Sequence, residues 1–167
     1  MRLTAGRARE AFDYDPLTGQ LIWKIEPKSG NRHLGDIAGT ITKKGYVLIG
    51  IDREQIHAPR VIWLIVHGVE LDKEPDHRDG DPSNNRLANL RPATSSQQKR
   101  NKCVQSNNRS GLKGAFYHEA HKGKKWRSQI KVGKRLIFLG YHYTAEEAHA
   151  AYGASALEHF GEFARLS

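Results

Sequence analysis

The chain has 167 residues, of which 38% are hydrophobic, so it can bury one ordinary core or two small ones. Its longest apolar run, Val61 to Val66, is far too short to span a bilayer, and the N-terminal segment lacks the apolar centre of a signal peptide. The net charge of +9 indicates a polyanionic partner, because a basic surface attracts phosphate backbones at long range. We therefore expect a soluble, cytoplasmic protein without a membrane partner.

The lone Cys103 excludes an internal disulfide and a cysteine-based zinc cage. The scattered histidines also lack metal-ligand spacing, so a zinc site is not expected. A helix is predicted over Thr4–Phe12, with Thr4 as its N-cap, and a short apolar strand over Leu21–Lys24. The polar segment from Glu26 to Asp36 is typical of a loop.

Residues 37–42 and 46–51 are predicted to pair as a hairpin around the turn Lys43-Lys44-Gly45. The next segment, Pro59–His67, is apolar enough for a buried helix that ends at Gly68. His57, just before this helix, is interpreted as a structural residue or a phosphate contact.

The stretch from Pro75 to Thr94 reads PDHRDGDPSNNRLANLRPAT and is rich in turn-forming Asp, Gly, Pro and Asn. It predicts a tight reversal that carries Asp76 and His77 back against Asn89, with a polar helix starting near Thr94. A histidine can take a proton from water, and an adjacent aspartate can hold a hard divalent cation, which together suit phosphodiester hydrolysis. An ordinary solvated turn would use the same residue types.

The order DH, NNR and NL, preceded by RVIWLIVHG, resembles the HNH endonuclease family in its phage homing-endonuclease branch. The resemblance implies that His77 is the general base, that Asp76 is a metal ligand and that Asn89 constrains the loop. The family's second metal ligand, normally Asn or His, falls in register on Gln98, with Asn101 one helical turn further as the alternative. Such a site suits Mg²⁺ or Mn²⁺ that keeps several waters.

The second half of the chain is strongly basic: residues 86–141 hold 14 Lys or Arg and a single acid, Glu119. After a polar linker over 104–109, strands are predicted over residues 112–118, 126–132 and 135–141. A helix should follow from Thr144, which forms a capping box with Glu147, to about Gly161. Its small-residue face is expected at Ala148, Ala151, Ala154 or Ser155, and Leu157.

The segment from Ser110 to Gly161 resembles the DNA-binding domain of plant ethylene-response factors, the Apetala family, in its WRSQIK strand, its LG pair and its TAEEA helix start. In that family the outward face of the sheet lies in the major groove of DNA. Alternation along the middle strand points Trp126, Ser128 and Ile130 to the helix. The expected DNA contacts are Lys113, Phe116, His118, Arg127, Gln129, Lys131, Arg135 and Phe138.

These observations predict an α+β protein with a ββα-metal HNH nuclease domain over 1–103. A three-stranded antiparallel sheet packed on one helix follows over 104–167. The expected function is a metal-dependent, site-specific endonuclease that nicks double-stranded DNA and acts as a monomer or weak dimer. The alternatives are a non-cleaving DNA-binding protein with a decayed nuclease fold and, more distantly, a basic RNA-binding or ribosome-associated protein.

Overall fold

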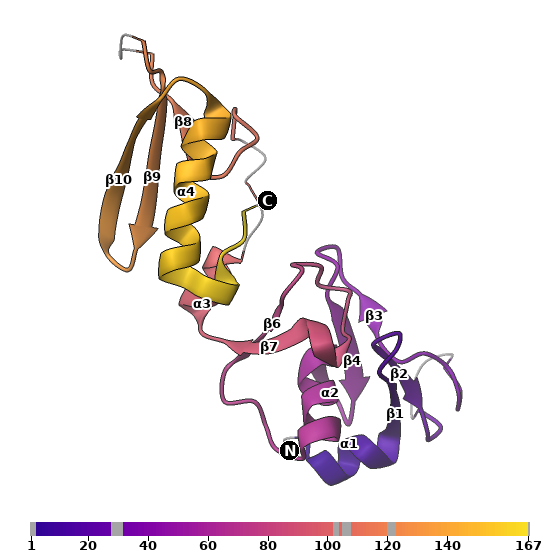
Figure 1. Cartoon of the computed structure of the whole chain (residues 1–167). Coiled ribbons are helices and arrows are strands. Elements are labelled where there is room, and N and C mark those ends of the chain that lie inside the picture. The colour runs from indigo at the N-terminus through magenta and orange to yellow at the C-terminus, as the bar shows by residue number, and fades with distance from the viewer. Residues whose placement is uncertain (1–2, 28–31, 102–103, 105–107, 120–122, 167) are drawn as a thin grey trace. The chain divides into compact units, whose positions relative to one another are not determined.

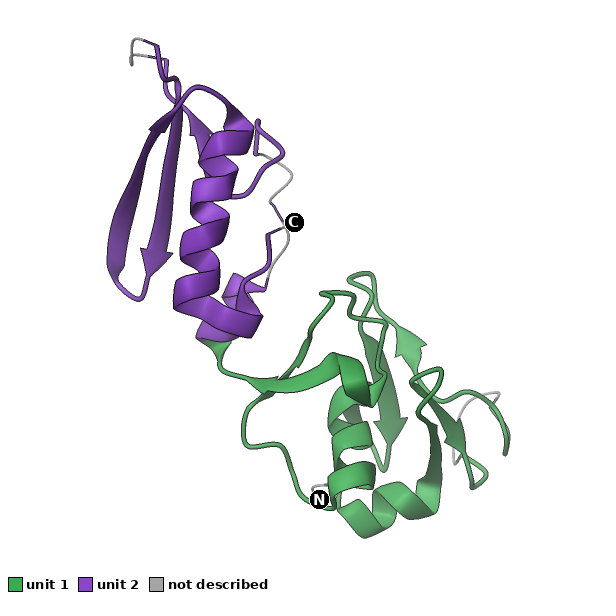
Figure 2. Ribbon diagram, in the orientation of Figure 1, with its two compact units in different colours: residues 1–95 green, residues 96–167 purple. Residues whose placement is uncertain are grey.

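The computed structural model describes residues 3–27, 32–101, 104, 108–119 and 123–166. The chain divides into two compact units, residues 1–95 and 96–167 (Figure 2). The expected boundary, between residues 103 and 104, lies C-terminal to this division between residues 95 and 96. The linker expected over 104–109 falls largely outside the described residues. No helix within the described ranges is long and apolar enough to cross a membrane.

The first unit combines two helices with three small antiparallel sheets, paired as β1-β2, β3-β4-β5 and β6-β7 (Figure 1). Its elements are α1 (Ala5–Ala11), β1 (Phe12–Asp15), β2 (Gln20–Trp23), β3 (Thr40–Ile41), β4 (Val47–Ile51), β5 (Glu54–His57), α2 (Ala58–His67), β6 (Glu74–His77), a 3₁₀ turn (Leu87–Asn89) and β7 (Leu90–Ala93). The predicted helices, the strand near Leu21 and both predicted hairpins are confirmed. Strands β1 and β5 were not expected.

Local chemistry explains the helix ends. The Thr4 side chain accepts a hydrogen bond from the backbone N–H of Arg7, 3.2 Å away, so it caps α1 as predicted. Pro59 lies in the first turn of α2, where its missing N–H costs nothing, and Gly68 ends the helix with a φ of 74°. Helix α1 ends one residue earlier than expected because Phe12 is extended and begins β1.

The core of the first unit lies between α1, α2 and the strands β1, β2 and β4. Phe12, Leu21, Ile49, Val61 and Ile62 are all at most 2% exposed. The ring of Phe12 packs against the ring of Trp23, with centroids 4.5 Å apart. This core fixes α2 and the strand hairpins that carry the candidate site, and it is independent of the second unit's core.

The second unit contains α3 (Ser95–Arg100), which spans the boundary, and one antiparallel sheet of order β10-β9-β8 covered on one side by α4 (Figure 1). The bounds are β8 (Ala115–Tyr117), β9 (Trp126–Val132), β10 (Arg135–His142), α4 (Ala145–Phe160) and a final 3₁₀ turn (Gly161–Phe163). The predicted α+β class, with three antiparallel strands on one helix, is confirmed.

Helix α4 packs closely on the sheet. Thr144 caps it as predicted, with the N–H of Glu147 donating to the Thr144 hydroxyl at 3.1 Å. The predicted capping box is not completed, because the Glu147 carboxylate accepts from the N–H of Tyr143 at 3.0 Å instead of from that of Thr144. Ala148 is buried as expected, but Leu157 is 56% exposed, so the predicted face was wrong at that position. The buried positions instead continue at Ala156 and Phe160, because the helix turns these residues onto Ile130 of β9.

Candidate active site and nucleic-acid face

The β6-β7 hairpin places the candidate catalytic residues at its end. Asp76 is paired in register with Arg91, and His77 with Leu90. The N–H of Arg78 donates to the carbonyl of Asn89 at 2.8 Å, so the chain reverses directly after His77. The expected reversal between two short extended segments is therefore present, and residues 78–89 form the loop, hereafter the site loop.

Asn89 holds the site loop through both ends of its amide. Its Oδ1 accepts from the N–H of Asp79 at 3.1 Å, while its Nδ2 donates to the Asp79 carboxylate at 2.9 Å and to the Asn84 carbonyl at 2.8 Å. Partial burial opposes ionisation of Asp79, but hydrogen bonds from Asp81, Asn84 and Asn89 outweigh it and lower the pKa of this carboxyl. The loop is thus fixed by an ionised aspartate surrounded by donors.

His77 is buried beside a residue that the sequence did not single out. Its Nε2 lies 3.0 Å from Oδ1 of Asn85, and the two residues are 6% and 2% exposed. Asn85 is the second of the two adjacent asparagines in the motif, so the only signal in the sequence was a position within the NNR run. The ring of Tyr46, the residue before β4, lies 6.4 Å from the His77 ring.

Asp76, the expected metal ligand, is 7% exposed and paired with Arg91, whose Nε donates to its Oδ2 at 2.9 Å. The described residues contain no group of three or more His, Cys, Asp or Glu side chains that could hold a metal ion. A single carboxylate supplemented by amide oxygens and water suits a hard cation such as Mg²⁺, and it does not suit a closed zinc site. Binding of such a cation by Asp76 stays a prediction.

The two candidate second ligands belong to the other unit. Gln98 lies on α3, and Asn101 follows that helix and is 6% exposed. Helix α3 packs within the second unit, where the Arg100 guanidinium lies 4.3 Å from the centre of the Phe160 ring. The assignment of either residue as a metal ligand stays a prediction.

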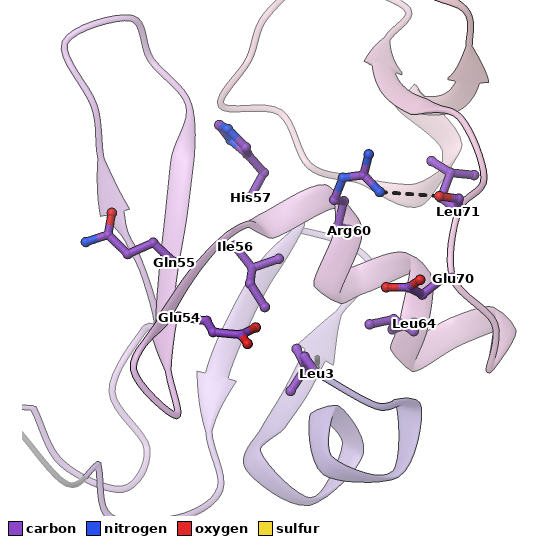
Figure 3. A pocket seen from close by; sticks show the side chains of 9 residues that line it. All are labelled: Leu3, Glu54, Gln55, Ile56, His57, Arg60, Leu64, Glu70 and Leu71. Carbon is purple, nitrogen blue, oxygen red and sulfur yellow. Dashed lines mark hydrogen bonds between the residues drawn. The ribbon is translucent and has the colours of Figure 1, made fainter. Parts of the chain in front are cut away.

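His57 ends β5 and precedes α2, and its exposed ring contacts Tyr46 edge-on at 5.5 Å. It lines a cavity of about 370 Å³ together with Leu3, Glu54, Gln55, Ile56, Arg60, Leu64, Glu70 and Leu71 (Figure 3). Arg60 is held there by the Leu71 carbonyl at 3.3 Å and by Glu74 at 2.7 Å. These two contacts give Arg60 a structural role in the wall of the cavity.

The sheet of the second unit separates a helix side from an outer face, as alternation predicted. Ser128 donates to the Ala148 carbonyl of α4 at 2.7 Å, and Trp126 and Ile130 pack in the helix-side clusters. The outer face carries the alternate residues of β9 and their cross-strand partners. These are Phe116, Arg127, Gln129, Lys131, Leu136, Phe138 and Tyr141.

An aromatic cluster orients the arginine of this outer face. The Arg127 guanidinium lies 5.6 Å from the centre of the Phe138 ring, which contacts Tyr141, and Tyr141 in turn contacts His118. Tyr141 was missed because a bulge between Phe138 and Gly140 shifts the alternation by one residue. Among the described residues, no hydrogen-bond partner reaches His118 Nδ1, Arg127 Nε or Gln129 Oε1.

Two expected DNA contacts take other positions. The Lys113 ammonium donates to the carbonyls of Arg100 and Arg165, each at 2.9 Å, so it serves the fold of the second unit. Arg135 alternates with Ile137, which packs in the core, and therefore starts on the helix side of β10 although it is exposed. The outer face itself is carried by the remaining expected residues together with Leu136 and Tyr141.

Comparison with known proteins concerns the first unit and the start of the second. No curated protein and no solved structure gives a significant match to the chain. A family model described as HNH endonuclease matches residues 57–100, from the end of β5 through α2, β6, β7 and α3. The matched segment includes Asp76, His77, Asn85 and Asn89, and it supports assigning the candidate site to an HNH nuclease, with DNA as the substrate that such a domain implies.

Proposed function

We propose that the chain is a metal-dependent, site-specific DNA endonuclease of homing type that nicks one strand of a duplex. The observation that carries this proposal is the buried His77, which directly precedes the site loop and is hydrogen-bonded through Nε2 to Asn85. Both residues lie within the segment that matches an HNH endonuclease. A neutral imidazole held at one nitrogen can accept a proton at the other.

In the proposed reaction His77 takes a proton from a water molecule, and that water attacks the phosphorus of one phosphodiester. Asp76 would hold the divalent cation, with Gln98 or Asn101 supplying an amide oxygen. Bound Mg²⁺ or Mn²⁺ would polarise the phosphate and stabilise the leaving oxygen. Asn89 keeps the site loop closed, so that Asp76 and His77 are presented from one short hairpin.

We further propose that the second unit binds duplex DNA through the outer face of its sheet, in the manner of the ethylene-response-factor domain that it resembles. Arg127 and Gln129 have the donor and acceptor patterns that read guanine and adenine edges in the major groove. One buried atom of each, Arg127 Nε and Gln129 Oε1, lacks a hydrogen-bond partner among the described residues, so the fold leaves part of the hydrogen-bonding capacity of these two side chains unused. Lys131 is exposed and suits a phosphate contact.

Cleavage of supercoiled plasmid tests the proposal, with Mg²⁺, Mn²⁺ or EDTA and with wild type beside His77→Ala. His159→Ala is the matched control, since His159 is exposed on α4. We expect metal-dependent nicked circles, and a fall of about 10²–10⁴-fold in rate for His77→Ala alone. Equal cleavage by His77→Ala and the control would contradict the role of His77.

A non-cleaving DNA-binding protein is the second candidate. It is favoured by the buried ion pair between Asp76 and Arg91, which occupies one carboxylate oxygen, and by glutamine at the third motif position. Duplex binding that is unaffected by EDTA, with no cleavage in either metal, would establish this candidate.

With one site per chain, a nicking monomer is expected, and sedimentation of the active species measures its oligomeric state.

A further inference from the structure

The geometry around His77 determines which ring nitrogen carries its proton. The Asn85 amide is oriented by its Nδ2, which donates to the Ser83 carbonyl at 3.2 Å, so its oxygen faces the imidazole. The reversed amide would set two carbonyl oxygens against each other. A carbonyl oxygen can only accept, so Nε2 of His77 carries a proton, and in the neutral imidazole the lone pair lies on Nδ1.

Asn85 is in turn held by the N-terminal hairpin. The Tyr14 hydroxyl, on β1, accepts from the N–H of Leu87 at 2.8 Å and donates to the Asn85 carbonyl at 3.3 Å. Burial raises the pKa of Tyr14, against an opposing effect of the Leu87 N–H, so the hydroxyl stays protonated and able to donate. These two contacts hold the backbone from Asn85 to Leu87.

The turn between β1 and β2 also touches this backbone directly. A Cβ added to Gly19, which has a φ of 80°, would lie 2.6 Å from the Arg86 nitrogen and 2.7 Å from the Asn85 carbonyl carbon. The Arg86 guanidinium donates back to the Leu17 carbonyl in the same turn. Residues 12–23 therefore hold the site loop, although they lie outside the segment that matches the HNH endonuclease model.

We infer that Asn85 is a positioning residue that fixes His77 in the Nε2-protonated tautomer, and that Tyr14 is a second positioning residue that holds Asn85. The N-terminal hairpin is then part of the catalytic apparatus. The inference rests on the proposed nuclease function for its catalytic meaning. The tautomer itself is a property of the folded protein and can be measured without cleavage.

Two measurements test the inference on the full chain. Long-range ¹H–¹⁵N NMR of the imidazole distinguishes the tautomers, and we expect neutral His77 to be protonated at Nε2 in wild type and to be a mixture in Asn85→Leu. Cleavage should fall about 10–100-fold in Asn85→Leu, the usual loss when the partner of a functional histidine is removed. Tyr14→Phe should show a smaller loss, and Tyr143→Phe, an exposed tyrosine, should show none.

Asn85→Asp separates positioning from a purely structural role. Its carboxylate still accepts from Nε2, so the Nε2-protonated tautomer and cleavage should both persist. An Nδ1-protonated wild type, or unchanged cleavage by a folded Asn85→Leu, would overturn the inference. A wild type with the Nε2-protonated tautomer and no cleavage would instead overturn the proposed function alone.

Discussion

Arg91 supports the most quantitative prediction, because its ion pair with Asp76 is almost fully buried. The two side chains are 3% and 9% exposed, and their atoms lie 2.9 Å apart. Arg91→Met keeps the volume of the side chain but leaves the Asp76 carboxylate in the interior without this cation. Breaking a buried pair in this way costs about 3–5 kcal/mol of unfolding free energy.

The expected cation should restore part of that loss. If Asp76 binds Mg²⁺, the ion stabilises the folded state, by about 2.7 kcal/mol at one hundred times its Kd. The gain should be larger in Arg91→Met than in wild type, since Arg91 no longer competes for the carboxylate. Adding Asp76→Asn to Arg91→Met should recover stability without metal and abolish the response to Mg²⁺.

Urea denaturation followed by NMR measures both effects, because resonances of the second unit provide an internal reference within each sample. Asp13→Asn is the control for charge removal, since Asp13 pairs with Lys24 at 3.4 Å on the surface and should lose only about 0.2–1 kcal/mol. A loss below about 1 kcal/mol in Arg91→Met would refute the electrostatic reasoning. Equal Mg²⁺ responses in wild type and in the double variant would refute Asp76 as a ligand.

Three further predictions concern the turn, the site loop and the outer face. Gly19→Ala should slow cleavage and destabilise the first unit by more than Gly35→Ala. Both glycines have positive φ, but of the two only Gly19 has other backbone atoms within 4 Å of the added Cβ. Equal unfolding free energies of the two variants would contradict the contact between the β1-β2 turn and the site loop. The pKa of Asp79 is lowered from 3.8, so its contribution to stability should be full above pH 3.8 and be lost as the pH falls through the folded-state pKa. Acid titration of the unfolding free energy should show this loss in wild type and lack it in Asp79→Asn. Phe138→Ala should weaken duplex binding by about 0.5–1 kcal/mol through the loss of the cation–π contact, as measured by fluorescence anisotropy, whereas Leu157→Ala on α4 should not.

Much of the first unit followed from local sequence. Helix α2 could be predicted from its apolar run between Pro59 and Gly68, and the β6-β7 hairpin from its turn residues. The contact of Tyr14 with residues 85 and 87 could not, because it joins segments separated by about seventy residues, which turn chemistry and periodicity do not report.

The second unit shows a different limit. Alternation along β9 was sufficient to separate Ser128 and Ile130 from Arg127 and Gln129. It failed on β10, where the bulge before Gly140 returns Tyr141 to the outer face, since a bulge changes the count of residues without a clear mark in the sequence. The use of Lys113 to cap carbonyls was equally invisible, because composition cannot distinguish a lysine that binds phosphate from one that binds its own backbone.

The distribution of charge explains why a nuclease of this design would need its second unit. Residues 1–95 carry 14 Lys or Arg and 13 Asp or Glu, whereas residues 96–167 carry 13 and 5. Strands β8, β9 and β10 contain no acid, and four of the five acids lie on α4 or in the turn that follows it. Because phosphate neutralisation supplies most non-specific affinity, the nearly neutral first unit has little means of holding DNA alone. Under the proposed function, binding is then assigned to the sheet face and chemistry to the hairpin, so variants of the outer face should act on KM and variants of the site loop on kcat.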